Sequence, residues 1–306
     1  LEFRRVLFRS RRARRLHQRA RSVVVSAMHP YRGRSASLAT RHGKLVAVAP
    51  AFRAPIGLDV VSVDVDTDSL GTFVGDRPRT GTQRETAIAK ARLGMAESGL
   101  SLGFATEASF GPLESNPFVN ACLELVVLVD DDLGIVLSEH EVDYTVPAVS
   151  AKVRDADISS IPLVAAGFPE HGLIVRPLEG YQPITKGVHD IDELRSAVAA
   201  CTEASVSATV VVESDFRAHH SPARLQVIER AARKLAQRAA TLCRECGVPG
   251  WGVVGRNAGA PCRECGEATR IAASEVSGCA KCDAKVERRL PESEGVDPRF
   301  CPSCNP

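Results

Sequence analysis

Eight of the ten cysteines lie in the last 64 residues of the 306-residue chain and form four Cys-x-x-Cys turns, numbered here as knuckles 1 to 4. In chain order they are Cys243/Cys246, Cys262/Cys265, Cys279/Cys282 and Cys301/Cys304, separated by 15, 13 and 18 residues. Two thiolates on one tight turn chelate a metal ion, and a second turn completes a tetrahedral Cys₄ site. The spacing predicts two structural Zn²⁺ ions in a zinc-ribbon module over residues 242–306.

The pairing of the four knuckles is open at this point. A sequential pairing joins knuckle 1 to 2 and 3 to 4, whereas a nested pairing joins 2 to 3 and 1 to 4, and we slightly favour the first. Eight cysteines could also form disulfides, but repeated CxxC turns are more typical of metal sites. Glycine follows knuckles 1 and 2, at Gly247 and Gly266, where such a turn often needs a positive φ.

The first 27 residues differ in composition from the rest. Leu1–Ser10 resembles the translation of a sequencing adapter, and we expect residues 1–27 to be a non-native or disordered leader; a targeting arm or a nucleic-acid-binding tail is the alternative. This segment carries nine Arg and one Glu, so residues 28–306 have a formal charge of −6 although the whole chain has +2. Nucleic acid is therefore a poor candidate partner for the body of the protein.

Alternating strand and helix patterns predict one α/β domain over residues 28–241, with a mixed central sheet flanked by helices. The expected strands are residues 36–40, 60–65, 102–105, 123–129, 134–139, 173–177 and 208–213, and the expected helices are residues 82–97, 190–200 and 222–241. Turns are expected at residues 111–112 and 130–132. No apolar run is long enough to cross a bilayer, so we expect a cytoplasmic protein without membrane contact.

Residues that begin the expected helices carry capping signals. Thr82 with Glu85 three residues later forms a potential capping box, and Asp190 is a suitable N-cap. Ser221 followed by Pro222 is the expected start of the last helix of the body. These residues support the helix assignments whether or not they also have a chemical role.

Four motifs are shared with one family. They are ATRHGK (Ala39–Lys44), GTQ (Gly81–Gln83), ATEASFGP (Ala105–Pro112) and the final CxxCNP. With ESDFRAHHSPAR (Glu213–Arg224), they make most of the chain resemble an uncharacterised bacterial domain of unknown function (DUF6671-like). This resemblance implies no known activity.

Three segments are also similar, in order and content, to the inosine/xanthosine triphosphate pyrophosphatases. They are LATRHGK (Leu38–Lys44), TQRETAIAKARLGM (Thr82–Met95) and GFATEASFGP (Gly103–Pro112). The resemblance implies that the first segment grips phosphates and that carboxylates of the other two hold Mg²⁺. The chain departs from the family at His42, where the family usually has Asn, and it lacks the family's Asp-Ser-Gly.

A second polar group lies between an expected strand and the last helix. It comprises Asp215, Arg217, His219, His220 and Arg224. Ligands of α/β proteins usually bind at the carboxyl ends of strands, so the two arginines could hold phosphate or carboxylate groups, and His219 could move a proton. The alternative is a network of salt bridges that caps the helix.

Two hypotheses follow. The first is a Mg²⁺-dependent nucleotide pyrophosphatase-like hydrolase whose catalytic residues would be Lys44, Glu85, Glu107 and His219. Its nucleotide or other phosphorylated ligand would contact Thr40, Arg41, His42, Asp215, Arg217 and Arg224. The second is a non-catalytic protein that binds a ligand or a partner and is stabilised by its zinc tail. Convergence of Lys44, Glu85, Glu107 and Arg217 on one cleft would favour the hydrolase, and dispersal would favour the second hypothesis.

Overall fold

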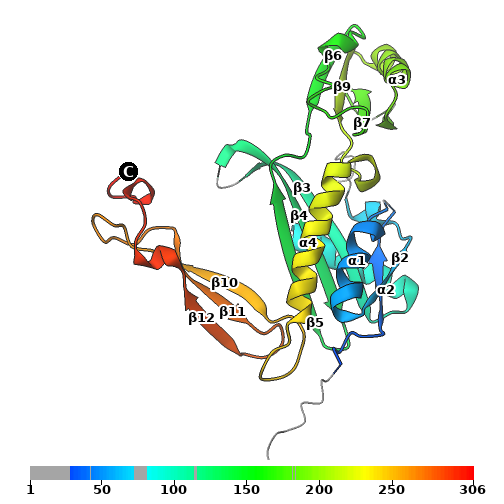
Figure 1. The fold of residues 1–306 in the computed structure, drawn as a ribbon. Helices are drawn as coiled ribbons and strands as arrows, with labels where there is room; N and C mark the ends of the chain where they lie inside the picture. Colours follow the sequence, from blue (N-terminus) through cyan, green and yellow to red (C-terminus); the bar gives the residue numbers. More distant parts are fainter. Residues whose placement is uncertain (1–27, 42, 72–80, 114–115, 181, 183) are drawn as a thin grey trace, which may run out of the picture.

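The computed structural model describes residues 28–41, 43–71, 81–113, 116–180, 182 and 184–306. The expected leader (residues 1–27) and His42 lie outside the described residues. Three sheets of five, four and three strands follow one another along the described chain. The first two sheets form an elongated body, and the third sheet projects from it (Figure 1).

The largest sheet is mixed and has the order β2-β1-β3-β4-β5. Its strands are β1 (Ser35–Ala39), β2 (Asp59–Val63), β3 (Leu102–Leu113), β4 (Asn116–Asp130) and β5 (Ile135–Asp143). β1 runs parallel to β2 and β3, and β3, β4 and β5 form an antiparallel meander. The predicted α/β class with a mixed central sheet is confirmed.

Helices cover both faces of this sheet. Helices α1 (Leu45–Ile56) and α4 (Pro222–Ala240) pack on one face, where strand residues such as Leu102 and Phe104 are buried with them. Helix α2 (Gln83–Ser98) packs on the other face, against alternate strand residues. A side chain in place of Gly103 would overlap Met95, so this glycine permits the close approach of α2.

The second sheet lies between β5 and α4 in the chain. It has the order β6-β9-β7-β8, with β6 (Ser150–Arg154), β7 (Leu173–Pro177), β8 (Thr185–Val188) and β9 (Thr209–Ser214). All neighbouring strands are antiparallel, and helix α3 (Ile191–Ala204) covers one face through a separate core. Residues 28–241 thus hold a second sheet beside the central mixed sheet, and each sheet buries its apolar side chains against its own helices.

The third sheet forms the cysteine-rich tail. It is an antiparallel meander of β10 (Gly252–Ala258), β11 (Ala272–Gly278) and β12 (Lys285–Arg289). Short 3₁₀ helices complete the described chain at residues 67–70, 158–160, 218–220, 291–294 and 298–300. The tail contacts the body at its first knuckle, where Gly250 lies against Leu137 of β5, and its other end points away (Figure 1).

Some of the predicted helix caps and turns are confirmed, and others are wrong. Thr82 and Glu85 form the predicted capping box, and Asp190 caps α3 by accepting two backbone N–H groups. Ser221 occupies the N-cap position of α4, but its side chain makes no capping hydrogen bond. The turn expected at residues 111–112 is wrong, because both residues pair with β4 inside an extended hairpin; the turn after Asp130 is present.

Within the body, α1, β6 and β8 were not expected from the sequence. Helix α1 contains Pro50 and Pro55, which normally argue against a helix. It nevertheless buries Val48, Phe52 and Ile56 in the main core, and this burial outweighs the lost backbone hydrogen bonds. Among the described helices, none combines the length and the apolar composition needed to cross a membrane.

Candidate metal centres and a buried charge cluster

The three-stranded meander of the tail determines which knuckles meet. Knuckle 1 precedes β10 and knuckle 2 follows it, while knuckle 3 follows β11 and knuckle 4 comes after β12. Successive strands run in opposite directions, so odd-numbered knuckles gather at one end and even-numbered knuckles at the other. A seven-residue strand, about 24 Å long, separates the two ends. Both the sequential and the nested pairings are therefore wrong.

The sulfur atoms form two groups of four, each with all atoms within 4.8 Å of one another. The first group is Cys243, Cys246, Cys279 and Cys282, and the second is Cys262, Cys265, Cys301 and Cys304. The shortest contacts between knuckles, such as Cys246 Sγ to Cys279 Sγ, are 3.5–3.8 Å. Four sulfurs about 2.3 Å from a central ion would be about 3.8 Å apart. Each group could therefore hold one metal ion, and the donor set suits Zn²⁺.

Backbone groups around the thiols favour the thiolate form. The N–H groups of Lys281 and Cys282 donate to Cys279 Sγ over 3.3 and 3.4 Å. At Cys262, the backbone N–H of Cys265 is the main cause that lowers the pKa to about 7. Gly247 and Gly266 have φ of 71° and 75°, as expected for these turns. Because the thiolate is the ligand form, these contacts prepare the tail for metal binding.

A second chemical feature lies inside the body, at the carboxyl end of β1. Lys44 begins α1 and points inward, where its Nζ donates to Thr106 Oγ1 over 2.9 Å. Lys44 is 8% exposed, and burial together with the nearby Arg224 guanidinium lowers its pKa to about 8. Within the described part of the chain, the Lys44 ammonium has a hydroxyl partner and no carboxylate within salt-bridge distance. This is an unusual setting for a lysine.

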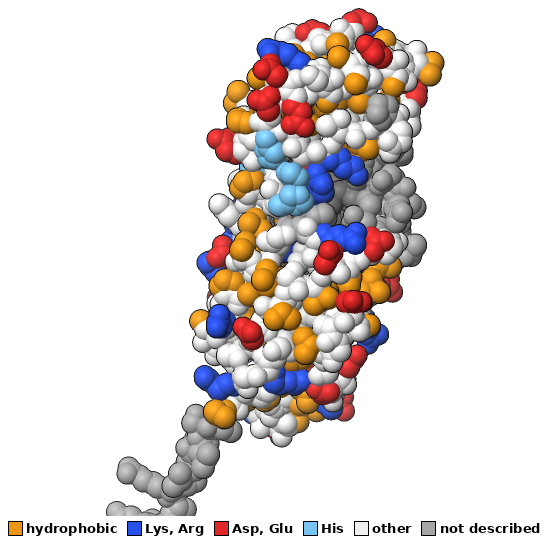
Figure 2. Space-filling model, turned by 90° about the vertical axis from the view of Figure 1, so that its right-hand side faces the viewer, with side chains coloured by type: hydrophobic (Ala, Val, Ile, Leu, Met, Phe, Trp, Pro, Cys, Tyr) orange, Lys and Arg blue, Asp and Glu red, His pale blue; other side chains and the backbone are white. Residues whose placement is uncertain are grey.

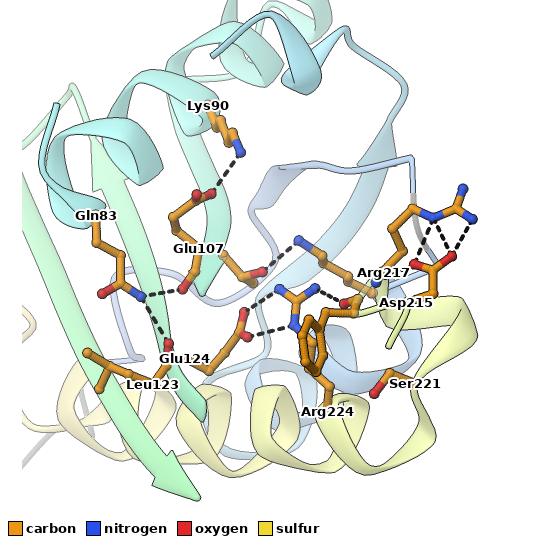
Figure 3. A network of polar contacts seen from close by, with 12 residues as sticks. Gln83, Lys90, Glu107, Leu123, Glu124, Asp215, Arg217, Ser221 and Arg224 are labelled. Carbon is orange, nitrogen blue, oxygen red and sulfur yellow. Dashed lines mark hydrogen bonds and ion pairs between the residues drawn. The ribbon is translucent and has the colours of Figure 1, made fainter. Parts of the chain in front are cut away.

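Arg224 and Glu124 form a buried ion pair (Figure 3), and both are charged neighbours of Lys44. Arg224 Nε and Nη2 donate to the two oxygens of Glu124 over 3.0 and 3.2 Å, and both side chains are at most 1% exposed. Arg224 also donates to the backbone carbonyl of Phe216. We call Lys44, Thr106, Glu124 and Arg224 the buried charge cluster. Its two cations face one carboxylate, so it carries a net charge of +1.

Glu107 lies on the opposite face of the sheet from this cluster. Its carboxylate pairs with Lys90 of α2 over 2.7 Å, and both side chains are nearly buried (Figure 3). Gln83 of α2 donates to the backbone carbonyls of Glu107 and Leu123. These contacts attach α2 to the β3–β4 hairpin. Glu107 therefore does not share a cleft with Lys44.

The other residues expected to bind phosphate or Mg²⁺ are dispersed. Glu85 is exposed and accepts from the Thr82 backbone N–H and hydroxyl, which lower its pKa. Arg41 is also exposed and pairs with Asp64 and Asp66 on the loop after β2. Thr40 is buried at the end of β1. The capping role expected as the alternative for Glu85 is thus observed, and the four test residues do not converge on one cleft.

The segment before α4 lies between the β1–α1 loop and the second sheet. Asp215 is buried and accepts hydrogen bonds from Arg217 through both carboxylate oxygens. Burial opposes ionisation of Asp215, but the Arg217 contacts keep its pKa lowered. His219 is exposed, and its Cβ lies about 4.0 Å from the position that a Gly43 Cβ would occupy. Figure 2 shows histidine and basic side chains together midway along this face. Within the predicted polar group, His219 therefore lies beside the β1–α1 loop, whereas Arg217 and His220 lie against Gly187 of β8.

His220 faces the second sheet. Its Nδ1 lies 2.8 Å from His189 Nε2, and His189 Nδ1 lies 2.6 Å from the carbonyl oxygen of Pro169. Burial is the main cause that lowers the pKa of His220 to about 4. The ring packs so closely on Gly187 that a side chain there would overlap it. His220 thus attaches the segment before α4 to the second sheet. Its role is distinct from that of His219.

Four members of these networks were not predicted from the sequence: Lys90, Thr106, Glu124 and His189. Glu124 had a signal, since it is the one charged residue of the apolar stretch LELVVLV. A carboxylate on a buried strand requires a partner. Arg224 has the matching signal, because Val227 and Ile228 place it on the apolar face of α4.

One family model matches residues 90–306 of the chain and carries the description "Domain of unknown function (DUF6671)". The motifs ATRHGK and GTQ lie before the matched residues. No curated protein matches the chain, and nothing supports the similarity to pyrophosphatases. Because the matched region covers more than half of the chain and includes both cysteine groups, the chain belongs to the DUF6671 family.

Proposed function

We propose that the protein binds a phosphorylated small molecule at the carboxyl end of β1 and that its tail is a structural module holding two zinc ions. The observation that carries the first part is the net positive charge of the buried charge cluster. Glu124 is already satisfied by two hydrogen bonds from Arg224, so it does not neutralise Lys44 as well. A bound anion would compensate the remaining charge.

The surroundings of Lys44 suit an anion. Lys44 occupies the N-cap position of α1 and its side chain makes no capping hydrogen bond, so the positive end of the helix dipole could favour an anion there. Gly43 is exposed with a φ of 66°, which brings bare backbone to the surface directly before Lys44. His219 lies beside Gly43 and could contact further oxygens of the ligand. This combination is typical of phosphate sites.

Mg²⁺-dependent hydrolysis has weaker support. A metal-dependent hydrolase needs carboxylates that face one ion. Glu85 instead caps a helix at the surface, and Glu107 is paired with Lys90 behind the sheet. The non-catalytic alternative therefore accounts better for the arrangement, with a nucleotide as one possible phosphorylated ligand.

The tail would bind Zn²⁺ through thiolates alone. Four sulfur ligands occupy all four coordination positions of a tetrahedral zinc ion and leave none for water or substrate. The tail has few large apolar side chains, so the metal replaces a core that the short strands cannot form. Zinc therefore stabilises the tail without taking part in a reaction.

Lys44→Met should weaken anion binding at least tenfold. The substitution keeps the length of the side chain and removes the charge, and a hydrogen bond to a charged group contributes about 1.5–3 kcal/mol. The measurement is calorimetric titration of the full chain with inorganic pyrophosphate and with ATP, without Mg²⁺. Lys152→Met, on an exposed position of β6, is the matched control and should leave the affinity unchanged. Equal affinity of both variants would reject the site, and phosphate release on addition of Mg²⁺ would restore the hydrolase hypothesis.

Lys44→Met should also stabilise the protein at neutral pH. The pKa of Lys44 falls from 10.5 in the unfolded chain to about 8 in the folded one. The unfolded chain therefore holds this proton more tightly, and folding is penalised fully below pH 8 and not at all above pH 10.5. The penalty is about 3 kcal/mol.

The stability difference between Lys44→Met and the unaltered protein should hence shrink by about 3 kcal/mol from pH 7 to above pH 10. Hydrogen exchange of peptides from α1 and β3 reports this difference. Lys152→Met should show no such pH dependence. A constant difference for Lys44→Met would mean that the buried lysine is not held in its charged form.

A further inference from the structure

The two sheets of the body enclose a pocket of about 410 Å³ that no residue of the proposed anion site lines. Strands β3, β4 and β5 form one side, and strands β6, β7 and β9 form the other. This volume lies within the range of small-ligand pockets, and such pockets occur preferentially between structural units. Because each sheet has its own core, the pocket is a space that neither core fills.

Aromatic and aliphatic side chains make up most of the wall. Phe110 of β3 and Phe216 stack with their ring centroids 3.6 Å apart and their planes within 14°. Both rings line the pocket, as do Val146, Val149 and Ile174. The stacked rings and the aliphatic side chains give the pocket an apolar wall, which favours a flat, weakly polar molecule.

Polar groups are present at the pocket, but their charges are balanced. Asp143 pairs with Arg230, and Glu213 pairs with Arg176 over 3.3 Å. Both carboxylates can still accept hydrogen bonds, and Asn120 adds an amide that both donates and accepts. The lining is therefore suited to a neutral ligand with hydrogen-bonding edges and unsuited to an ion.

We propose that this pocket between the two sheets binds a planar heterocycle of the purine nucleoside type. A purine has two apolar faces for the aromatic wall and a polar edge for the carboxylates and the amide. Its ribose hydroxyls suit the same polar groups. The proposal is independent of the anion site, since it concerns a ligand without phosphate and different side chains.

The test is calorimetric titration of the full chain with adenosine and guanosine. We expect at least one of them to bind with a Kd below about 1 mM. Ala148 lines the pocket at an exposed position, so Ala148→Trp can fill the space without burying a new side chain in either core. This variant should lower the affinity at least tenfold, and circular dichroism checks that it folds.

Val164→Trp is the matched control, because Val164 is 96% exposed in the same unit and does not line the pocket. It should bind the nucleoside as the unaltered protein does. Absence of binding for both nucleosides up to 1 mM would overturn the proposal, and so would undiminished binding by Ala148→Trp. Lys44→Met should not affect nucleoside binding, so a failure here is distinguishable from a failure of the anion site.

Discussion

Removing knuckles 1 and 3 together should leave one zinc ion per chain, whereas removing knuckles 1 and 2 should leave none. The reason is that knuckles 1 and 3 share one group of four sulfurs and knuckles 2 and 4 share the other. Each knuckle is removed by changing its two cysteines to serine, which keeps the size and abolishes the thiolate. Native mass spectrometry of the full chain, purified under reducing and zinc-replete conditions, counts the metal ions directly.

The two other pairings give opposite outcomes in this experiment. Sequential pairing would leave one ion after removal of knuckles 1 and 2, and nested pairing would leave one after removal of knuckles 1 and 4. Cys262→Ser alone should release the ion of the second group, at the free end of the tail. The ion of the first group, at the end of the tail next to the body, should be retained. Cys201→Ala is the control, since Cys201 is buried under α3 and distant in the fold from both groups, and it should retain two ions. A chain that binds no zinc would overturn the proposed metal sites.

Glu124→Gln should be the most destabilising single substitution in the body, at about 3–5 kcal/mol. It keeps the shape of the side chain but leaves Lys44 and Arg224 as two neighbouring buried cations without a carboxylate. Arg224→Met should cost less, because Glu124 can then interact with Lys44. The double variant should be more stable than the sum of the two single effects predicts, because it leaves no unpaired member of this pair.

Hydrogen exchange of peptides from β4 and α4 measures this stability separately from that of the tail. Arg195→Met removes an exposed ion pair with Asp192 and serves as the control, with an expected change below about 0.5 kcal/mol. Additive effects of Glu124→Gln and Arg224→Met would show that the ion pair does not hold these elements together. A smaller effect of Glu124→Gln than of Arg224→Met would contradict the assigned charge balance.

Local sequence was sufficient for the features that depend on a few neighbouring residues. The CxxC turns, their glycines with positive φ and the Thr82–Glu85 capping box all fall in this class, because the interacting groups are at most a few residues apart. The long helices α2, α3 and α4 were also predicted, since each carries a helical pattern with a start signal.

Helix α1 and the extent of the β3–β4 hairpin could not be predicted in the same way. The two prolines of α1 carry a local penalty that only burial in the core outweighs, and burial is not visible in the local pattern. Residues Gly111 and Pro112 form a typical turn pair, but their strand partners in β4 impose an extended conformation. In both cases a tertiary contact overrides a local preference.

The sequence by itself determined the eight candidate metal ligands and the α/β class, because CxxC spacing and hydrophobic periodicity are local properties. Only the tertiary structure decided how the knuckles pair, since the direction of each intervening strand sets the end at which a knuckle lies. It also decided that Glu124 meets Arg224, 100 residues away in the chain, while Glu85 stays at the surface. The charge that favours an anion at Lys44 arises from that packing, because Lys44 is buried with a hydroxyl partner, Thr106, while Glu124 is paired with Arg224.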